Sequence, residues 1–108
     1  MVSSDISIFV NHGDGYTSWF EVGNMTSNVN RILRETVEGK ALSWFDGKTC
    51  AEARPVLESM WRELRQRPDH FRPFEIADWG SLDNFMPYLT RFYAMTRLHP
   101  NGQIRNWY

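Results

Sequence analysis

The chain has 108 residues, of which 42% are apolar and 23% are charged, and its formal net charge is −1. This composition is typical of a folded protein, so we expect residues 1–108 to form a single globular domain and not a disordered chain. A nearly neutral charge provides no basic surface for a phosphate backbone, and the sequence contains no apolar run long enough to cross a membrane. We therefore expect neither nucleic acid nor a membrane as a partner.

Residues with reactive side chains are few. Cys50 is the single cysteine, so it cannot form a disulfide within the chain. The histidines at positions 12, 70 and 99 are far apart in sequence, and we expect no metal site and no cofactor. The N-terminus lacks the basic and apolar segments of a secretory signal. These features favour a cytoplasmic protein.

Two strand patterns occupy the N-terminal part of the chain. The apolar residues Ile6, Ile8 and Val10 recur at every second position, which is the period of a half-buried strand. A loop with two glycines follows, and residues 17–22 form a second β-rich run. Two such runs separated by a short loop predict an antiparallel β-hairpin.

Polar residues mark the junction between the second strand and the first predicted helix. Asn24, Thr26 and Asn28 precede apolar residues at helical spacing, so we expect a helix over residues 27–38 that ends at Gly39. Asn and Thr side chains can accept hydrogen bonds from the free N–H groups of a first helical turn. The same geometry can bind an anion. A helix cap is the simpler interpretation, and a ligand site at these three residues is the alternative.

The clearest helix start lies at Thr49. Thr49 and Glu52 fit a capping box, in which the side chain of each residue bonds to the backbone N–H of the other. Apolar residues then recur on one face, and Pro68 predicts an end near residue 66. A thiol at the first helical position can have a lowered pKa. Because Cys50 has no apparent base beside it, we interpret it as a small residue that fills the helix start.

The last third of the chain predicts one more helix and a short strand. Ser81 is a candidate N-cap for a helix that ends before His99, and residues 103–108 are strand-like, with Ile104 as the inward anchor. This strand can pair beside the N-terminal hairpin or with a second copy, so a monomer and a homodimer both stay open. The predicted fold class is α+β, with a small antiparallel sheet packed on three α-helices.

Aromatic residues are abundant, with five Trp, four Tyr and seven Phe. A small domain has limited interior, so we expect some of these rings to be exposed, and exposed aromatic rings mark protein contacts. Those in connecting segments or near the end of the chain can either close the core from its edges or anchor a partner. The partner-surface candidates are Trp44, Phe45, Phe74, Trp79, Trp107 and Tyr108.

The order of these motifs resembles that of small, mostly uncharacterised proteins of actinobacteria and their phages. The resemblance covers residues 17–105 and implies a source and a context but no catalytic residues. The motifs that carry it are Asn24-x-Thr26-x-Asn28, Leu42 leading to Asp46-Gly47, the helix from Thr49 with its internal proline, Trp79-Gly80, and His99-Pro100 after the last helix.

These observations lead to two hypotheses about function. The first is a non-enzymatic protein-interaction module, with a phage protein that binds a host protein as the case that the resemblance implies. It rests on the aromatic surplus, the neutral charge and the lack of a catalytic constellation. The second is a small-ligand-binding protein or enzyme that uses Asn24, Thr26 and Asn28, with the loop around His12 at the other end of the second strand.

Overall fold

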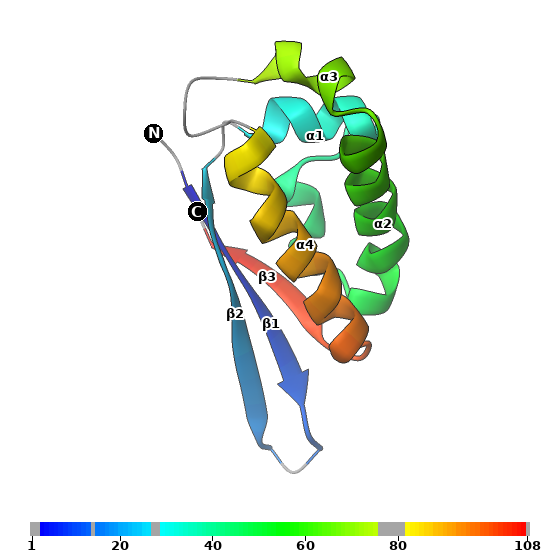
Figure 1. Cartoon of the computed structure of the whole chain (residues 1–108). Coiled ribbons are helices and arrows are strands. Elements are labelled where there is room, and N and C mark those ends of the chain that lie inside the picture. Colours follow the sequence, from blue (N-terminus) through cyan, green and yellow to red (C-terminus); the bar gives the residue numbers. More distant parts are fainter. Residues whose placement is uncertain (1–2, 14, 27–28, 76–81, 108) are drawn as a thin grey trace.

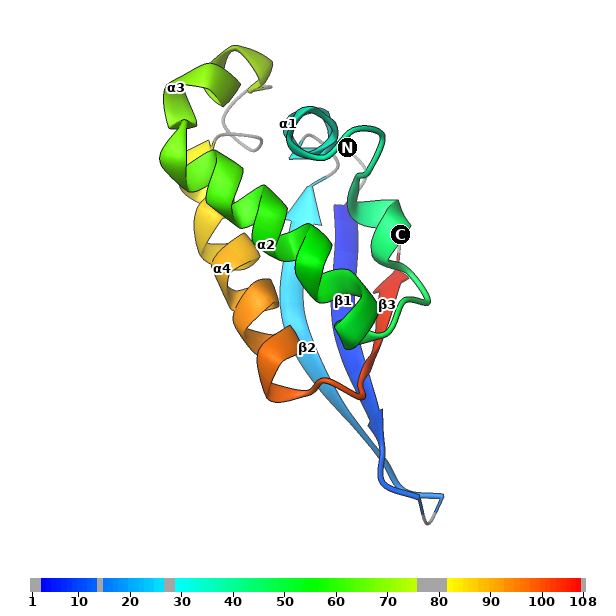
Figure 2. The same cartoon turned by 90° about the vertical axis from the view of Figure 1, so that its right-hand side faces the viewer.

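A computed structural model of the chain describes residues 3–13, 15–26, 29–75 and 82–107. Three strands form one antiparallel sheet in the order β2-β1-β3, with β1 at Ser3–Asn11, β2 at Thr17–Thr26 and β3 at Gln103–Trp107. The long helices α2 (Cys50–Gln66) and α4 (Leu82–Leu98) cover one face of this sheet (Figures 1 and 2). The predicted α+β class is confirmed.

Two short helices complete the helical layer, which therefore holds one helix more than predicted. They are α1 (Asn30–Thr36) and α3 (Pro68–Phe71), and both lie at the end of the layer opposite the hairpin tip (Figures 1 and 2). Pro68 ends α2 as predicted, and it also starts α3, because a proline at a first helical position loses no hydrogen bond. A 3-10 helix at Arg72–Phe74 follows α3 directly.

The β1–β2 hairpin contains a β-bulge that lengthens β2. Ile6 pairs with Gly23 and Ser7 pairs with Glu21, so β2 has one residue more than β1 at this point. The sequence pattern predicts that this strand ends at residue 22. Beyond the bulge, however, Met25 is buried as part of the same strand. That prediction is wrong, since β2 continues to Thr26, where it pairs with Ser3.

The predicted helix cap at residues 24–28 is also wrong. Asn24 and Thr26 belong to β2, and α1 begins at Asn30 after Val29, which makes no side-chain cap hydrogen bond. This segment is extended and pairs with β1, so no helical turn forms there for Asn24 or Thr26 to cap. Asn28 lies outside the described residues.

The capping box of α2 is confirmed. Thr49 Oγ1 accepts a hydrogen bond from the backbone N–H of Glu52 at 3.1 Å, and Glu52 Oε1 accepts one from the backbone N–H of Thr49 at 3.1 Å. The predicted N-cap of α4, Ser81, lies outside the described residues. The helices bury their apolar faces against the sheet in one cluster with the inward residues of β1 and β3. The main helical members are Ala53, Leu57, Met60, Leu64, Phe85, Leu89 and Phe92.

The C-terminal strand pairs within the chain. Ile104 lies opposite Ile8 and is fully buried, which confirms it as the inward anchor. On its other side β3 contacts the segment before α2, because Gly47 N–H donates to the Ile104 carbonyl and Ile104 N–H donates to the Lys48 carbonyl, both at 2.8 Å. Both edges of β3 are therefore occupied. In the part of the chain that the structure describes, no helix is long and apolar enough to cross a membrane.

Candidate functional site

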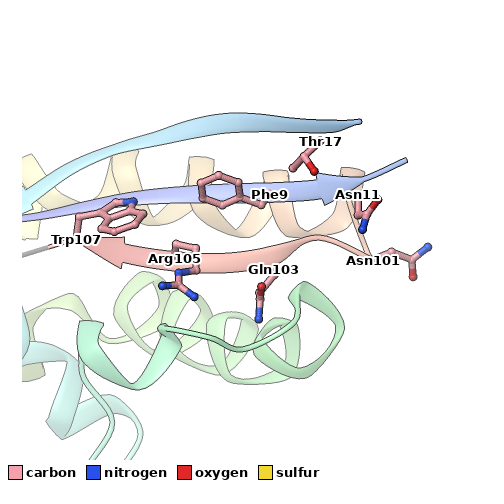
Figure 3. A pocket seen from close by; sticks show the side chains of 7 residues that line it. All are labelled: Phe9, Asn11, Thr17, Asn101, Gln103, Arg105 and Trp107. Carbon is pink, nitrogen blue, oxygen red and sulfur yellow. The ribbon is translucent and has the colours of Figure 1, made fainter. Parts of the chain in front are cut away.

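The face of the sheet that points away from the helices is the candidate site, and we call it the open face. The side chains of β1 that point there alternate with the inward Ile6 and Ile8, and α4 lies behind the strands in this view (Figure 3). Within the described ranges no helix or strand packs over this face (Figures 1 and 2). The open face consists of Asp5, Ser7, Phe9 and Asn11 on β1, Thr17, Trp19 and Glu21 on β2, and Gln103, Arg105 and Trp107 on β3.

Three aromatic rings lie on the open face. Phe9 and Trp19 are cross-strand neighbours whose ring centroids are 5.9 Å apart at an interplanar angle of 21°, so they stack. On the other side of β1, the guanidinium carbon of Arg105 lies 5.5 Å from the ring centroid of Trp107. This distance is that of a cation–π contact. Trp19 is 63% exposed and Trp107 is 50% exposed, so both rings are accessible.

A hollow of about 530 Å³ lies on the β1–β3 side of the open face (Figure 3). Phe9 and Trp107 give it apolar walls, while amide and hydroxyl groups provide donors and acceptors of hydrogen bonds. The lining contains no carboxylate, histidine or cysteine, and its charge comes from Arg105. Such a lining can bind a polypeptide, and its one hydroxyl, on Thr17, has no carboxylate or histidine beside it in the lining to act as a general base. The lining residues are Phe9, Asn11, Thr17, Asn101, Gln103, Arg105 and Trp107.

The predicted partner-surface residues do not gather in one place. Trp107 lies on the open face as described above. Trp44 is half-buried at the edge of the core, with the ammonium groups of Lys40 and Lys48 at 5.4 and 5.0 Å from its ring centroid. Phe74 is half-buried beneath the guanidinium of Arg31. These rings close the core from its edges, which is the other interpretation of the loop aromatics.

The prediction that Phe45 belongs to a partner surface is wrong. Its side chain is fully buried and contacts the ring of Phe92 edge-on, with centroids 5.2 Å apart, so a partner cannot reach it. The 3-10 helix Leu42–Phe45 explains this burial, because residues three apart point the same way in such a helix. Trp79 and Tyr108 lie outside the described residues.

Of the alternative ligand site, the structure describes the side chain of Asn24 but not Asn28. The Asn24 side-chain amide donates to Asp5 Oδ1 at 2.6 Å, so it ties β2 to β1 across the hairpin. Thr26 is the last residue of β2. His12 lies at the opposite end of the strand, where its Nε2 is 2.9 Å from Ser18 Oγ. The two polar segments are thus separated by the length of β2, as the hairpin predicts.

Two described side chains with catalytic potential, Cys50 and His99, are held in packing contacts. Cys50 is fully buried, and burial raises the pKa of its thiol to about 11, against a smaller lowering by the charge of Arg54. His99 follows α4 and stacks on Phe20 with ring centroids 4.3 Å apart. In the described ranges, no three His, Cys, Asp or Glu residues are placed to hold a metal ion together.

Phe9, Trp19 and Arg105 belong to the open face but were not among the predicted site residues. The signal was present in the alternation of β1, because Ile6 and Ile8 point inward and Phe9 must then point outward. Trp19 shares this direction through its cross-strand pairing with Phe9. The pairing of β3 with β1, which places Arg105 and Trp107 on the same face, is a long-range feature that no local pattern predicts.

Comparison of the chain with protein-family models, with curated proteins and with solved structures finds no match. The similarity to small actinobacterial and phage proteins thus remains an expectation from the motifs. The features of the open face that bear on function are its exposed aromatic rings and its hollow.

Proposed function

We propose that the protein is a small non-enzymatic protein-interaction module that binds its partner through the open face. The observation that carries this proposal is the presence of Trp19 and Trp107, largely exposed, on a sheet face that no other described element covers. Trp and Arg are the residues most enriched among the energetic anchors of protein interfaces. Here Arg105 lies against Trp107, so an anchor of each kind is already in position.

The chemistry of the hollow supports a polypeptide as the bound molecule. Amide side chains such as Asn11 and Gln103 both donate and accept, which suits the alternating N–H and C=O groups of a backbone. Phe9 and Trp107 provide the apolar part of the lining. Burial of an exposed Trp side chain in a partner's surface contributes on the order of 2 kcal/mol.

A host protein of an actinobacterium is the partner that the motif resemblance implies, and this is the proposal's most specific form. The first experiment is a capture from actinobacterial lysate with the wild-type chain and with a Trp19→Ala/Trp107→Ala double variant. We expect a protein that the wild type retains and that the double variant loses, with its Kd weakened about 30-fold or more by each anchor.

A matched control is Leu98→Ala, which removes an exposed apolar side chain from α4, on the opposite side of the sheet from the open face. The control should retain the same protein as the wild type. Recovery of an identical set of proteins by all three forms would contradict the proposal, because binding would then not depend on the open face. Circular dichroism of the double variant confirms that it is folded, since both rings are removed from the surface.

A further inference from the structure

The two outer edges of the sheet differ. Lys48 and Gly47 bond to the outer edge of β3, and Thr49 forms a bridge with Gln103. The outer edge of β2 has no strand partner anywhere in the described part of the chain. An unpaired edge presents backbone N–H and C=O groups to solvent and can accept a further strand.

One half of the β2 edge is protected and the other half is not. Near the helices, Arg91 of α4 donates to the Glu21 carbonyl at 3.4 Å, and the β-bulge at Gly23 interrupts the strand. Toward the hairpin tip, residues 16–20 carry no proline and no charged side chain. Prolines and charged side chains are the means by which natural edge strands avoid pairing, and residues 16–20 have neither. The hairpin also projects beyond the end of α4, so no helix lies beside its tip (Figures 1 and 2).

The direction of the backbone groups follows from the hairpin ladder. His12 N–H donates to the Tyr16 carbonyl at 2.9 Å, so Tyr16 bonds toward β1. In an antiparallel pair this direction alternates from residue to residue, so Thr17 and Trp19 direct their N–H and C=O groups to the free edge. The Glu21 carbonyl, which bonds to Arg91 outside the sheet, fits the same alternation.

We propose that a second copy of the chain pairs with this edge, antiparallel and with Ser18 opposite Ser18 on a two-fold axis. In this register Thr17 of each copy exchanges backbone hydrogen bonds with Trp19 of the other, so all four outward groups of each segment are satisfied. Tyr16 of each copy lies beside Phe20 of the other. Because the segment has no charged side chain, no like charges oppose the contact.

Exposure of the aromatic rings favours a second copy as the occupant. Tyr16 is 65% exposed and Trp19 is 63% exposed, and they lie on opposite faces of the same short segment. A two-fold contact gives both rings a neighbour along the sheet, because Tyr16 meets the Phe20 ring, which already stacks on His99, while Trp19 meets Thr17 at its edge and keeps its outer face open. Such a self-complementary contact is the normal form of a symmetric dimer.

A dimer of this kind goes beyond the proposed function, and it would also enlarge the surface that binds the partner. Pairing of the two edges makes a six-stranded sheet whose open faces lie on the same side, so the Phe9–Trp19 stacks of both copies become neighbours. The paired segments are short, and their contact is at the low end of specific interfaces, below about 1,200 Å². We therefore expect a dimer that dissociates on dilution.

The sharpest test is a disulfide at the two-fold axis. The Ser18–Ser18 pair would be a non-hydrogen-bonded pair with Cα atoms about 4.5 Å apart, which is within the range of a disulfide. Ser18→Cys should therefore form a covalent dimer under mild oxidation. The native Cys50 is buried and should give no background in the wild type.

Thr17→Cys is the matched control, because position 17 is the next residue and is more exposed, but it lies off the axis. We expect several-fold less covalent dimer from Thr17→Cys than from Ser18→Cys. Equal yields from the two variants, or no dimer from Ser18→Cys, would overturn the proposal.

A second measurement avoids any new cysteine. Sedimentation of the wild type should show a mass that rises toward twice that of the monomer with concentration. Thr17→Pro removes an outward N–H and leaves the ladder with β1 intact, so it should remain monomeric, whereas Thr17→Ala should still dimerise. A wild type that stays monomeric at every concentration would overturn the proposal. Trp19 takes part in both contacts, whereas Trp107 lies on β3, away from the free edge, so capture by a Trp107→Ala variant tests the open face separately from the dimer.

Discussion

The ring of Tyr88 on α4 packs directly on the backbone of Gly23 in β2. A Cβ atom added to Gly23 would lie 3.0 Å from Tyr88 Cδ1 and 3.2 Å from Cε1. Gly23 also has a φ of +152° at the β-bulge, a conformation that residues with side chains rarely adopt. The bulge, the glycine and the tyrosine therefore form one feature that fixes how α4 sits on the sheet.

Gly23→Ala should destabilise the fold by about 1–3 kcal/mol, because it combines backbone strain with the contact to Tyr88. Urea denaturation of the variant and the wild type measures this difference. The double variant Gly23→Ala/Tyr88→Ala separates the two causes, since it removes the contact but keeps the strain. If the single variant were as stable as the wild type, the assigned conformation of Gly23 would be wrong.

Gly102 is required for a different reason, namely that its surroundings leave no space for a side chain. A Cβ at Gly102 would lie 2.5 Å from Ile8 Cγ2 and 3.1 Å from the His99 carbonyl oxygen, and Gly102 has no positive φ. Gly102→Ala should therefore cost about 1–3 kcal/mol through overpacking. In a double-mutant cycle with Ile8→Ala, we expect the combined cost to be smaller than the sum of the single costs. Strict additivity would show that Gly102 does not contact Ile8.

The capping box gives α2 a pH dependence. Hydrogen bonds from the backbone and the side chain of Thr49 lower the pKa of Glu52 below its ordinary value. A carboxyl group whose pKa is lower in the folded state stabilises the fold above its unfolded pKa, and this contribution is lost as the pH falls through the folded pKa. Glu52→Gln keeps an acceptor but does not titrate in this range.

We therefore expect the wild type to be more stable than Glu52→Gln at neutral pH and to lose this advantage in acid. Melting temperatures measured for both forms from neutral to acidic pH check the expectation. An advantage that persists unchanged at low pH would mean that the ionised form of Glu52 is not the one that caps the helix.

Local features of the fold were predictable and long-range ones were not. The capping box joins Thr49 and Glu52, which are three residues apart, so the sequence alone predicts it. The end of β2 depends on the pairing of Thr26 with Ser3 and on a bulge, neither of which has a local signature. For this reason the strand takes up Asn24 and Thr26, which local propensity assigns to a helix cap.

The same distinction applies to the site. Trp107 was identifiable as a terminal aromatic residue, but its place beside Arg105 on the open face depends on the pairing of β3 with β1. Phe45 has the same local signals as Trp44, and the 3-10 helix decides which of the two is fully buried. Phe9 is an apolar residue at an outward position of β1. The sequence does not show whether another element covers that face, so it does not predict that Phe9 belongs to a binding surface.

Asn106 joins the buried end of β3 to the segment before α2. The Asn106 side-chain amide donates to the Leu42 carbonyl at 3.0 Å, and its backbone N–H donates to Asp46 Oδ1 at 2.9 Å. Asn106→Ala leaves the buried carbonyl of Leu42 without this donor, which should cost about 1–3 kcal/mol. Gln103→Ala, on the exposed face of the same strand, should change stability by less than about 0.5 kcal/mol.

Deletion of residues 106–108 should lower stability further, because it removes the Asn106 bonds together with Trp107 and its pairing with Asp5. It should not change the concentration dependence of the mass, since β3 pairs within the chain and the free edge belongs to β2. A melting curve and sedimentation of the truncated chain measure the two effects separately. A loss of dimer in the truncated chain without a loss of stability would place the contact between copies at β3 instead of at the edge of β2.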